Sequence, residues 1–391
     1  MPRFEPFRGL RYRPGAVRLN QVVAPPYDVV GPAQRSTLAA RSPYNAIRVE
    51  LPEADLHRGL DRYRVAAELL AAWTARSVLV ADPAPALYPY RMTSPEGRTS
   101  TGVIGALEVG ADDVLPHEQT MPKPRSDRLD LLRATGANLS PIWGLSPAAG
   151  LSATFAPSGP PAGDAYDDDG VRHQIWVLDH PDAVDEVARA VAGAPVVVAD
   201  GHHRYETARA YREEAGPGPA DLVMALVVEL TEEQLTVGAI HRAVAGLPPG
   251  TDVPATAGRW FDALRAGPAT GRVVSALGGS GSLALVTPEG AWLLTPRPEA
   301  YEAAGSDLDS SLVDLVLAEL PPHEATHRHS WEEAWSAVEG GEAQAAFLLR
   351  PASVAQIAEW AAARRRMPPK TTYFSPKPRT GMVFRQLTTG G

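Results

Sequence analysis

The chain contains no cysteine, which excludes disulfides, thiolate nucleophiles and cysteine-ligated zinc. It also lacks an excess of basic residues: its formal net charge is −9, whereas proteins that neutralise many DNA phosphates are usually basic. No apolar run in the sequence reaches the roughly 18 residues that a membrane-spanning helix needs. These absences predict a cytoplasmic protein that binds neither nucleic acid nor a membrane.

Helix-type and strand-type patterns follow each other along the 391 residues, which suffice for one large domain or two ordinary ones. Residues 86–109 favour a β-hairpin, the alternation at residues 45–51 favours a half-buried strand, and residues 259–265 favour a helix. The mixture predicts an α+β protein whose sheets are not purely parallel. A linker-like stretch suggests two domains, residues 1–250 and residues 251–391.

The most informative segment spans residues 196–208. An apolar β-branched run ends in Asp-Gly and a helical pattern begins at once, which predicts a strand, a tight turn and a helix N-terminus. The backbone amides that follow Asp200 would cradle a phosphate, Arg204 would clamp it, and Asp200 would hold Mg²⁺ or orient a hydroxyl. In the alternative interpretation, Asp200 only caps the helix and the neighbouring histidines are solvated.

A second candidate is the proline-rich loop that begins at Pro116. It carries a carboxylate at Glu118 and cations at Lys123 and Arg125. A stiff loop holds catalytic groups near their working geometry, so Glu118 would act as a general base while the two cations bind phosphate. The alternative is a solvated charged loop.

A third pattern, His323-Glu324-Ala325-Thr326-His327, fits the H-E-x-x-H template of zinc hydrolases. On a helix, His323 and His327 would share one face and ligate zinc, with Glu324 as the base. Two prolines directly precede the pattern, however, and the sequence offers no convincing third ligand. Zinc hydrolysis is therefore the least favoured of the functions considered.

Basic and hydroxyl-bearing residues near the C-terminus form a fourth candidate. The loop that contains Lys370 and Lys377 would either fold back onto an anion or serve as a surface connection. His241 and Arg242, which follow a strand-like segment, allow the same two interpretations.

Five segments taken together resemble the DUF1015 family of bacteria and archaea, and the resemblance covers nearly the whole chain. They are Ala24-Pro25-Pro26-Tyr27-Asp28-Val29, Pro116-His117-Glu118-Gln119-Thr120-Met121-Pro122-Lys123-Pro124, Arg128-Leu129-Asp130-Leu131-Leu132-Arg133-Ala134-Thr135, Ala199-Asp200-Gly201-His202-His203-Arg204-Tyr205-Glu206-Thr207-Ala208 and Tyr373-Phe374-Ser375-Pro376-Lys377-Pro378. Two of these motifs, Pro-His-Glu-Gln and Asp-Gly-His-His-Arg, are also similar to motifs of the archaeal free-serine kinase. That resemblance implies a ParB/sulfiredoxin-like core with large elaborations.

The resemblance to the kinase further implies phosphoryl transfer to the hydroxyl of a small, serine-like metabolite, with ADP, ATP or pyrophosphate as the donor and Mg²⁺ as the cofactor. The expected catalytic residues are Glu118, Asp200 and His203, with Asp200 also the metal ligand. The residues expected to bind phosphate or nucleotide are Gly201, His202, Arg204, Lys123, Arg125, Lys370 and Lys377. Those expected to bind the substrate are His117, His241 and Arg242.

The sequence departs from these relatives in ways that limit the function. The insertion between the two kinase-like motifs is much longer, and Ala239-Ile240 stands where the family usually has Pro-Thr. No cysteine occupies the His202 position, so sulfiredoxin chemistry is excluded, and no helix-turn-helix or basic face suggests ParB-like DNA binding. A nucleotide-binding or regulatory module without catalysis remains an alternative, and the oligomeric state is open.

Overall fold

The computed structural model describes residues 1–116, 118, 126–268 and 281–387. Within them the chain forms two compact units: Met1–Leu235 with Pro376–Gly391, and Thr236–Ser375. We call these unit 1 and unit 2. The predicted boundary lay at residue 250, whereas the chain enters unit 2 earlier and returns to unit 1 for its C-terminal segment.

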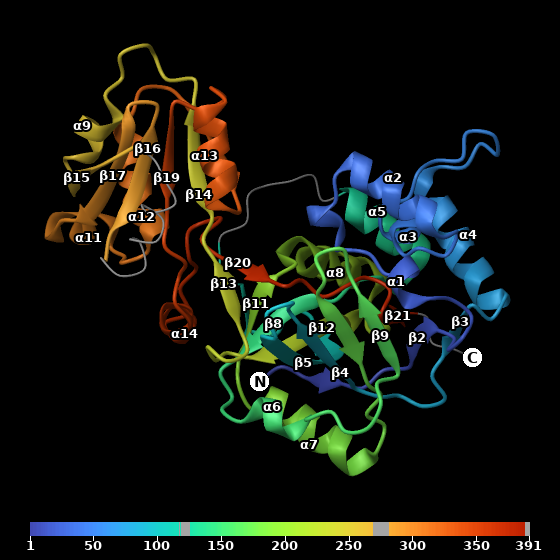
Figure 1. The fold of residues 1–391 in the computed structure, drawn as a ribbon. Coiled ribbons are helices and arrows are strands. Elements are labelled where there is room, and N and C mark those ends of the chain that lie inside the picture. The colour runs from blue at the N-terminus through green and yellow to red at the C-terminus, as the bar shows by residue number, and fades with distance from the viewer. Residues whose placement is uncertain (117, 119–125, 269–280, 388–391) are drawn as a thin grey trace. The chain divides into compact units, whose positions relative to one another are not determined.

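Unit 1 is built around a nine-stranded mixed sheet (Figure 1). Its strand order is β6 (Val114–Pro116), β11 (Val196–Asp200), β8 (Ile142–Ser146), β12 (Leu222–Glu229), β5 (Thr99–Glu108), β4 (Tyr88–Thr93), β10 (Arg172–Ile175) and β9 (Gly163–Tyr166), with β1 (Phe4–Glu5) paired to β5. β11 runs parallel to β6 and β8 runs parallel to β12, while the other pairs are antiparallel. The α+β class with mixed sheets is confirmed, and so is the predicted hairpin, formed by β4 and β5.

The central strands of this sheet are nearly continuous apolar runs because they are buried on both faces. Helix α7 (Pro181–Ala192) places Val184, Val187 and Val191 at helical spacing in the core that also contains Val196 and Val198 of β11. The other helices of this part of unit 1 are α6 (Leu151–Thr154), α8 (His202–Ala215) and the short η2 (Pro219–Asp221). This packing fixes the end of β11.

A second layer of unit 1 combines N-terminal helices with a small sheet. The sheet has the order β3 (Leu79–Ala81), β2 (Gly9–Tyr12), β21 (Phe384–Gln386) and β7 (Ala137–Asn138). The helices are α1 (Leu19–Val22), η1 (Tyr27–Val29), α2 (Pro32–Arg41), α3 (Ile47–Glu50), α4 (Arg62–Ala75) and α5 (Ser126–Thr135). The strand predicted at residues 45–51 is wrong, because α3 is buried almost all round and alternation of residue type therefore carries no information on its conformation.

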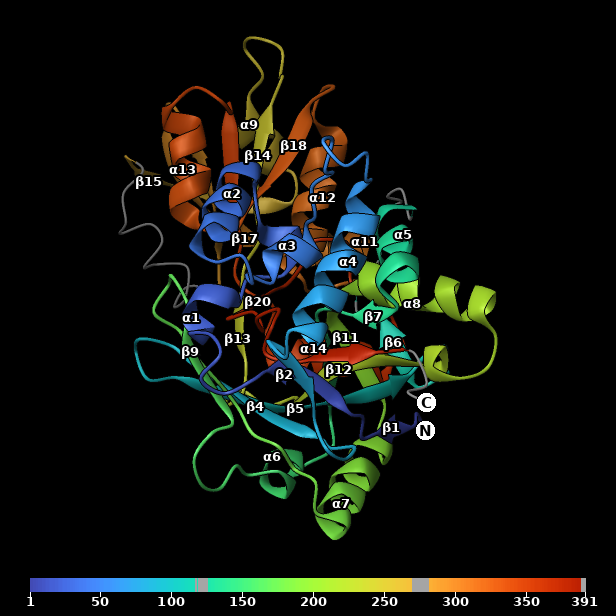
Figure 2. The same ribbon diagram turned by 90° about the vertical axis from the view of Figure 1, so that its right-hand side faces the viewer.

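Unit 2 is a six-stranded antiparallel sheet with helices on both faces (Figure 2). The strand order is β15 (Phe261–Gly267), β17 (Gly290–Pro296), β16 (Leu283–Thr287), β19 (Ala345–Leu348), β14 (His241–Ala245) and β18 (Glu324–Arg328). Helices α9 (Val253–Ala257), α11 (Pro298–Ala304) and α12 (Asp309–Glu319) share the core of one face, and α13 (Trp331–Glu339) packs on the other. The remaining elements of unit 2 are α14 (Val354–Ala362) and the pair formed by β13 (Thr236–Gly238) and β20 (Tyr373–Ser375).

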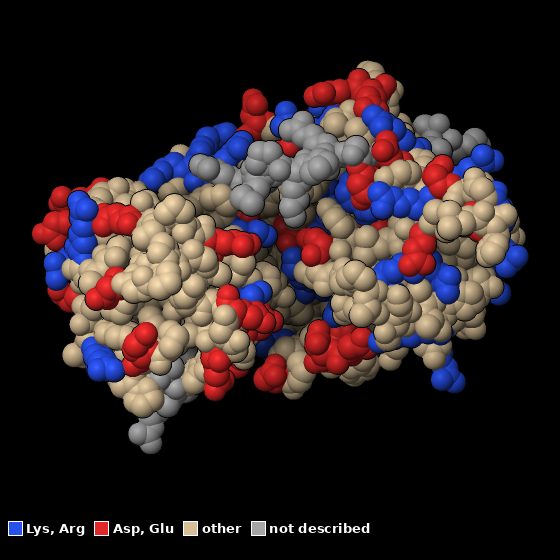
Figure 3. Space-filling view, turned by 90° about the horizontal axis from the view of Figure 1, so that it is seen from above, with Lys and Arg blue, Asp and Glu red and all other residues tan. Residues whose placement is uncertain are grey.

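The helix predicted at residues 259–265 is wrong, because this segment forms the edge strand β15. Its pairing with β17 is distant in the sequence, and an edge strand with exposed side chains carries no clear alternation. No helix of the described residues is long and apolar enough to cross a membrane. In Figure 3, basic and acidic side chains are interspersed over the face shown.

Candidate functional site

The predicted strand, turn and helix at residues 196–208 are confirmed. Strand β11 ends at Asp200, Gly201 adopts the left-handed conformation with φ 85°, and α8 begins at His202. Glycine fits here because a Cβ at this position would lie only 3.0 Å from the guanidinium carbon of Arg204. The N-cap of α8 is Gly201, which has no capping side chain, so the interpretation of Asp200 as a simple N-cap is wrong.

Asp200 is instead the centre of an ion cluster. Its Oδ2 accepts a hydrogen bond from Nη2 of Arg204 at 2.8 Å, and its Oδ1 accepts one from Nζ of Lys377. The same Nζ lies 4.0 Å from Oδ2 of Asp28. Burial alone would raise the pKa of Asp200, but the charges of Lys377 and Arg204 outweigh it and hold the pKa below its usual value. Asp200 is therefore ionised at neutral pH.

The segment that carries Lys377 is tied into unit 1 by a buried polar network. The Nδ1 of His173 lies 2.9 Å from the Tyr90 hydroxyl, and its Nε2 lies 2.9 Å from the carboxylate of Asp167. Arg379 donates its side chain to Asp167 and its backbone N–H to the hydroxyl of Tyr90 at 3.1 Å. These hydrogen bonds hold the backbone at Arg379, two residues after Lys377, and so fix the course of the segment that carries Lys377.

The strand that leads towards Glu118 runs parallel to the strand that ends at Asp200. β6 pairs with β11 so that Val114 lies beside Val196 and Pro116 lies beside Val198. This pairing ends at Pro116, and β11 is irregular between Val198 and Asp200 where it pairs with β8, so the approach of Glu118 to Asp200 stays a prediction. The ends of parallel strands beside a helix N-terminus are a common place for ligands in α/β proteins.

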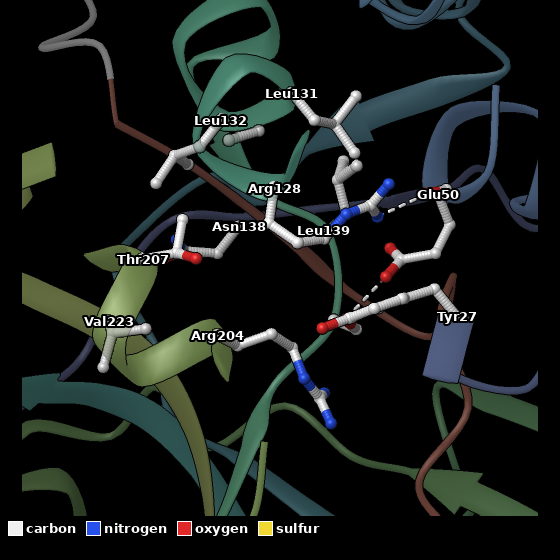
Figure 4. A pocket seen from close by; sticks show the side chains of 12 residues that line it. Tyr27, Glu50, Arg128, Leu131, Leu132, Asn138, Leu139, Arg204, Thr207 and Val223 are labelled. Carbon is white, nitrogen blue, oxygen red and sulfur yellow. Dashed lines mark hydrogen bonds between the residues drawn. The ribbon is translucent and has the colours of Figure 1, made fainter. Parts of the chain in front are cut away.

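A pocket adjoins the ion cluster on the side of α5 (Figure 4). Its polar lining comes from Tyr27, Glu50, Arg128, Asn138, Ser140, Arg204 and Thr207, and its apolar lining from Leu131, Leu132, Ala137, Leu139 and Val223. The empty space of the pocket amounts to about 450 Å³ including its open mouth. The centre of a water molecule can occupy about 60 Å³ of it. The pocket therefore suits a molecule of a few heavy atoms.

Three charged or polar side chains define the chemistry of this pocket. The guanidinium of Arg128 lies over the ring of Tyr27, 4.4 Å from its centroid, and donates to the backbone carbonyl of Glu50 at 2.7 Å. Burial raises the pKa of Tyr27 to about 12, so its hydroxyl stays protonated. Burial also raises the pKa of Glu50, against the opposing effects of Arg128 and Arg204.

No sequence motif pointed to a specific site role for Tyr27, Asp28, Glu50 or Arg128. Tyr27, Asp28 and Arg128 lie in segments that carried the family resemblance. That resemblance was the only sequence signal that could have pointed to them. Glu50 gave a weaker one, as an acidic residue inside an otherwise largely apolar stretch. The structure brings all four to the cluster around Arg204, since each of them contributes to the electrostatic environment of Arg204 or lines the same pocket.

Other predicted site residues lie elsewhere or outside the described residues. His117, Lys123 and Arg125 fall among residues that are not described, so their roles stay predictions. His202 and His203 occupy the first turn of α8, as expected.

Three of the predicted site residues, His241, Arg242 and Lys370, lie in unit 2, where each takes part in a hydrogen bond between a side chain and the backbone. Arg242 is 3% exposed and donates to the backbone carbonyls of Ile240 at 2.8 Å and Lys370 at 3.1 Å. His241 is buried in β14, and its Nδ1 accepts the backbone N–H of Leu349 at 3.1 Å. Lys370 is exposed in a left-handed turn with φ 60°. Their roles in binding phosphate or substrate remain predictions.

The zinc-hydrolase interpretation is wrong in its geometry. Glu324 and His327 lie in strand β18, and His323 directly precedes it. Four positions along a strand span about 13 Å, so His323 and His327 cannot jointly ligate one ion as they would on a helix. Among the described residues there is no group of three or more histidine or acidic side chains that could hold a metal ion.

Comparisons with known proteins give the following matches. Similar solved structures include a conserved hypothetical protein from Pyrococcus furiosus, with 15% identity over 72% of this chain and 93% of that one and a TM-score of 0.39. A mutant free serine kinase in complex with ADP has 13% identity, coverage of 73% and 92%, and a TM-score of 0.41. C-terminally truncated SbnI from Staphylococcus aureus has 12% identity, coverage of 72% and 86%, and a TM-score of 0.40.

A search of curated proteins finds no significant match. The family described as "Protein of unknown function (DUF1015)" matches residues 4–313, which is most of the chain and includes four of the five segments that carried the resemblance. The chain belongs to the DUF1015 family.

Proposed function

We propose that the chain is a phosphotransferase that moves a phosphoryl group from a nucleotide or pyrophosphate to the hydroxyl of a small metabolite. The observation that carries the proposal is the parallel pairing of β6 with β11, in which Pro116 lies beside Val198, two residues before Glu118 and Asp200 respectively, and α8 begins directly after β11. A base, cations and helix amides would thus meet in one place. The proposal also includes a ParB/sulfiredoxin-like core and a cytoplasmic location.

In the proposed reaction, the carboxylate of Glu118 accepts the proton of the acceptor hydroxyl. The hydroxyl oxygen forms a bond to the terminal phosphorus, and the bond from that phosphorus to the leaving phosphate oxygen breaks, with the electron pair going to the leaving group. The amides of the first turn of α8, together with Arg204 and Lys377, stabilise the negative charge on the phosphate oxygens. His203, at the second position of α8, would hold a phosphate oxygen.

Mg²⁺ fits this proposal through two carboxylates. Asp28 and Asp200 both lie within 4.0 Å of the ammonium group of Lys377, and oxygen ligands of this kind are the ones that Mg²⁺ prefers. When bound, the ion would neutralise charge on the donor phosphates. Since Lys377 already contacts Asp200, we expect the ammonium group and the ion to compete for that carboxylate.

The test compares Glu118→Gln with the wild type. Each protein is incubated with ATP, ADP or pyrophosphate, Mg²⁺ and small hydroxylated metabolites, and new phosphomonoesters are detected by ³¹P NMR. We expect the variant to slow turnover at least 100-fold, as loss of a general base does, while its nucleotide affinity by calorimetry stays within about threefold.

Glu96→Gln is the matched control, because Glu96 lies in the exposed turn between β4 and β5. It should leave both turnover and affinity unchanged. Wild-type turnover by Glu118→Gln overturns the role of the base. Tight nucleotide binding by the wild type without any product overturns the transferase and favours a nucleotide-binding or regulatory module.

A further inference from the structure

Glu50 is a buried carboxylate of which one oxygen is left without a hydrogen bond. It ends helix α3 and is 3% exposed. Its Oε1 accepts a hydrogen bond from Oγ of Ser140 at 3.1 Å. Its Oε2 is buried and has no hydrogen-bond partner among the described residues. An unsatisfied buried acceptor costs about 1–3 kcal/mol, and more when it is charged, so the arrangement favours a donor from outside the chain.

The neighbouring cations do not supply that donor. Among the described residues, Arg128 forms its ion pair with Asp127, and Arg204 forms its ion pair with Asp200. Towards Glu50, Arg128 donates only to the backbone carbonyl, as the dashed line in Figure 4 shows. Arg204 donates instead to Asp200 and to the carbonyl of Pro141. Asp28 is a further carboxylate nearby, and its negative charge adds to that of an ionised Glu50.

The cavity in front of Glu50 has the size and the lining for a small molecule. In Figure 4, Glu50 and Tyr27 enter it from N-terminal elements, Leu131 and Leu132 from α5, and Arg204 from α8. About 60 Å³ is open to the centres of water molecules, which is room for a few heavy atoms. The occupant needs a strong hydrogen-bond donor at one end and a short carbon chain against the leucines.

We infer that Glu50 binds the ammonium group of a small primary amine. An ammonium group donates hydrogen bonds to the unsatisfied oxygen and, as a cation, stabilises the ionised carboxylate against the cost of burial, whereas a hydroxyl group brings no charge. Arg204 lines the cavity and also binds Asp200, so an amine held here lies next to the proposed transfer site. Resting on the proposed function, this makes the phosphoryl acceptor an amino alcohol and Glu50 its specificity-determining residue.

The experiment measures binding without any phosphoryl donor, by calorimetry or NMR on the full chain. Two probe pairs differ only in the amine: 2-aminoethanol against ethylene glycol, and L-serine against L-glycerate. We expect the amine of each pair to bind the wild type at least tenfold more tightly than its partner. We expect Glu50→Gln, which keeps the volume of the side chain but removes its charge, to abolish that preference, and Glu96→Gln to keep it.

Equal affinities within each pair for the wild type would overturn the inference, and so would a preference that survives in Glu50→Gln. The comparison of probes on the wild type decides the matter even if the variant fails to fold. A wild type that prefers amines but transfers no phosphate supports the amine site and overturns the transferase. Transfer to an amino alcohol at an unchanged KM in Glu50→Gln supports the transferase and overturns the amine site.

Discussion

Lys377 donates a hydrogen bond to Asp200 across 177 positions of sequence, and through it the C-terminal segment completes the cluster at the end of β11. Asp200 also binds Arg204, four residues further along the chain. The two cations explain why a carboxylate can be buried here in ionised form. Because one of them comes from the C-terminal segment, the cluster is complete only when that segment is in place.

Replacing Lys377 by methionine should destabilise the protein by about 3 kcal/mol, since it leaves a buried carboxylate with one cation instead of two. The pKa of Asp200 should rise, because burial is then opposed by Arg204 and His202 without the charge of Lys377. Urea unfolding at pH 7 measures the first effect. The control Lys370→Met removes an exposed lysine and should change the stability by less than about 0.5 kcal/mol. Equal stability of the two variants would show that the buried ion pair contributes nothing.

Gly201→Ala should both destabilise the chain and weaken ligand binding. The left-handed conformation at this position costs a non-glycine residue about 1–2 kcal/mol. The new Cβ would also press on the guanidinium group of Arg204. Gly150→Ala is a matched control: Gly150 is likewise a left-handed N-cap, with φ 77°, but a Cβ there meets no atom within 4 Å.

We expect both glycine variants to lose a similar amount of stability from backbone strain, and only Gly201→Ala to lose nucleotide affinity. Urea unfolding and calorimetry with ADP measure the two effects separately. If both variants bind nucleotide as the wild type does, Arg204 does not contact the ligand.

The sequence predicted the turn at Asp200 because its signals are local: a β-branched run, an Asp-Gly turn and a helical pattern within a few residues. It could not predict the pocket beside Arg204, because Tyr27, Glu50 and Arg128 come from three separate helical segments and meet only through tertiary packing. The errors have the same origin. The segment of α3 alternates in residue type but is buried as a helix, and β15 is defined by its pairing with the distant β17.

The predicted approach of Glu118 to Asp200 lies between these cases. The motifs named both residues, but only the parallel pairing of β6 with β11, which ends two residues before each of them, bears on their distance in space. Parallel pairing joins segments that are far apart in the chain, and nothing in a single sequence states which strands become neighbours.

Acid should destabilise unit 2 through His241. Burial, reinforced by the charge of Arg242, lowers the pKa of His241 to about 4, whereas the unfolded chain takes up this proton near pH 6.5. Between these values the unfolded state binds more protons, so the stability falls as the pH falls from 7 to 4. Protonation of Nδ1 would also break the hydrogen bond from the backbone N–H of Leu349.

His241→Asn keeps an acceptor at the position of Nδ1 but takes up no proton, so the loss of stability between pH 7 and pH 4 should shrink by on the order of 2 kcal/mol. Urea unfolding of the full chain at several pH values measures this change. The control His180→Asn replaces a histidine whose side chain is 71% exposed and should leave the pH dependence as it is. An unchanged slope in His241→Asn would show that this histidine is not the source of the acid sensitivity.

Arg379 should act largely by positioning Lys377. Its bonds to Asp167 and Tyr90 hold the chain two residues after Lys377, and its own side chain takes no part in the Asp200 cluster described above. If those bonds are what bring Lys377 to Asp200, then Arg379→Met already weakens the Lys377 contact, and Lys377→Met has less left to remove. In a double-mutant cycle by urea unfolding, the two losses of stability should therefore sum to at least about 1 kcal/mol more than the loss in the double variant. Additivity within about 0.5 kcal/mol would mean that the two residues stabilise unit 1 independently and that Lys377 reaches Asp200 without the help of Arg379.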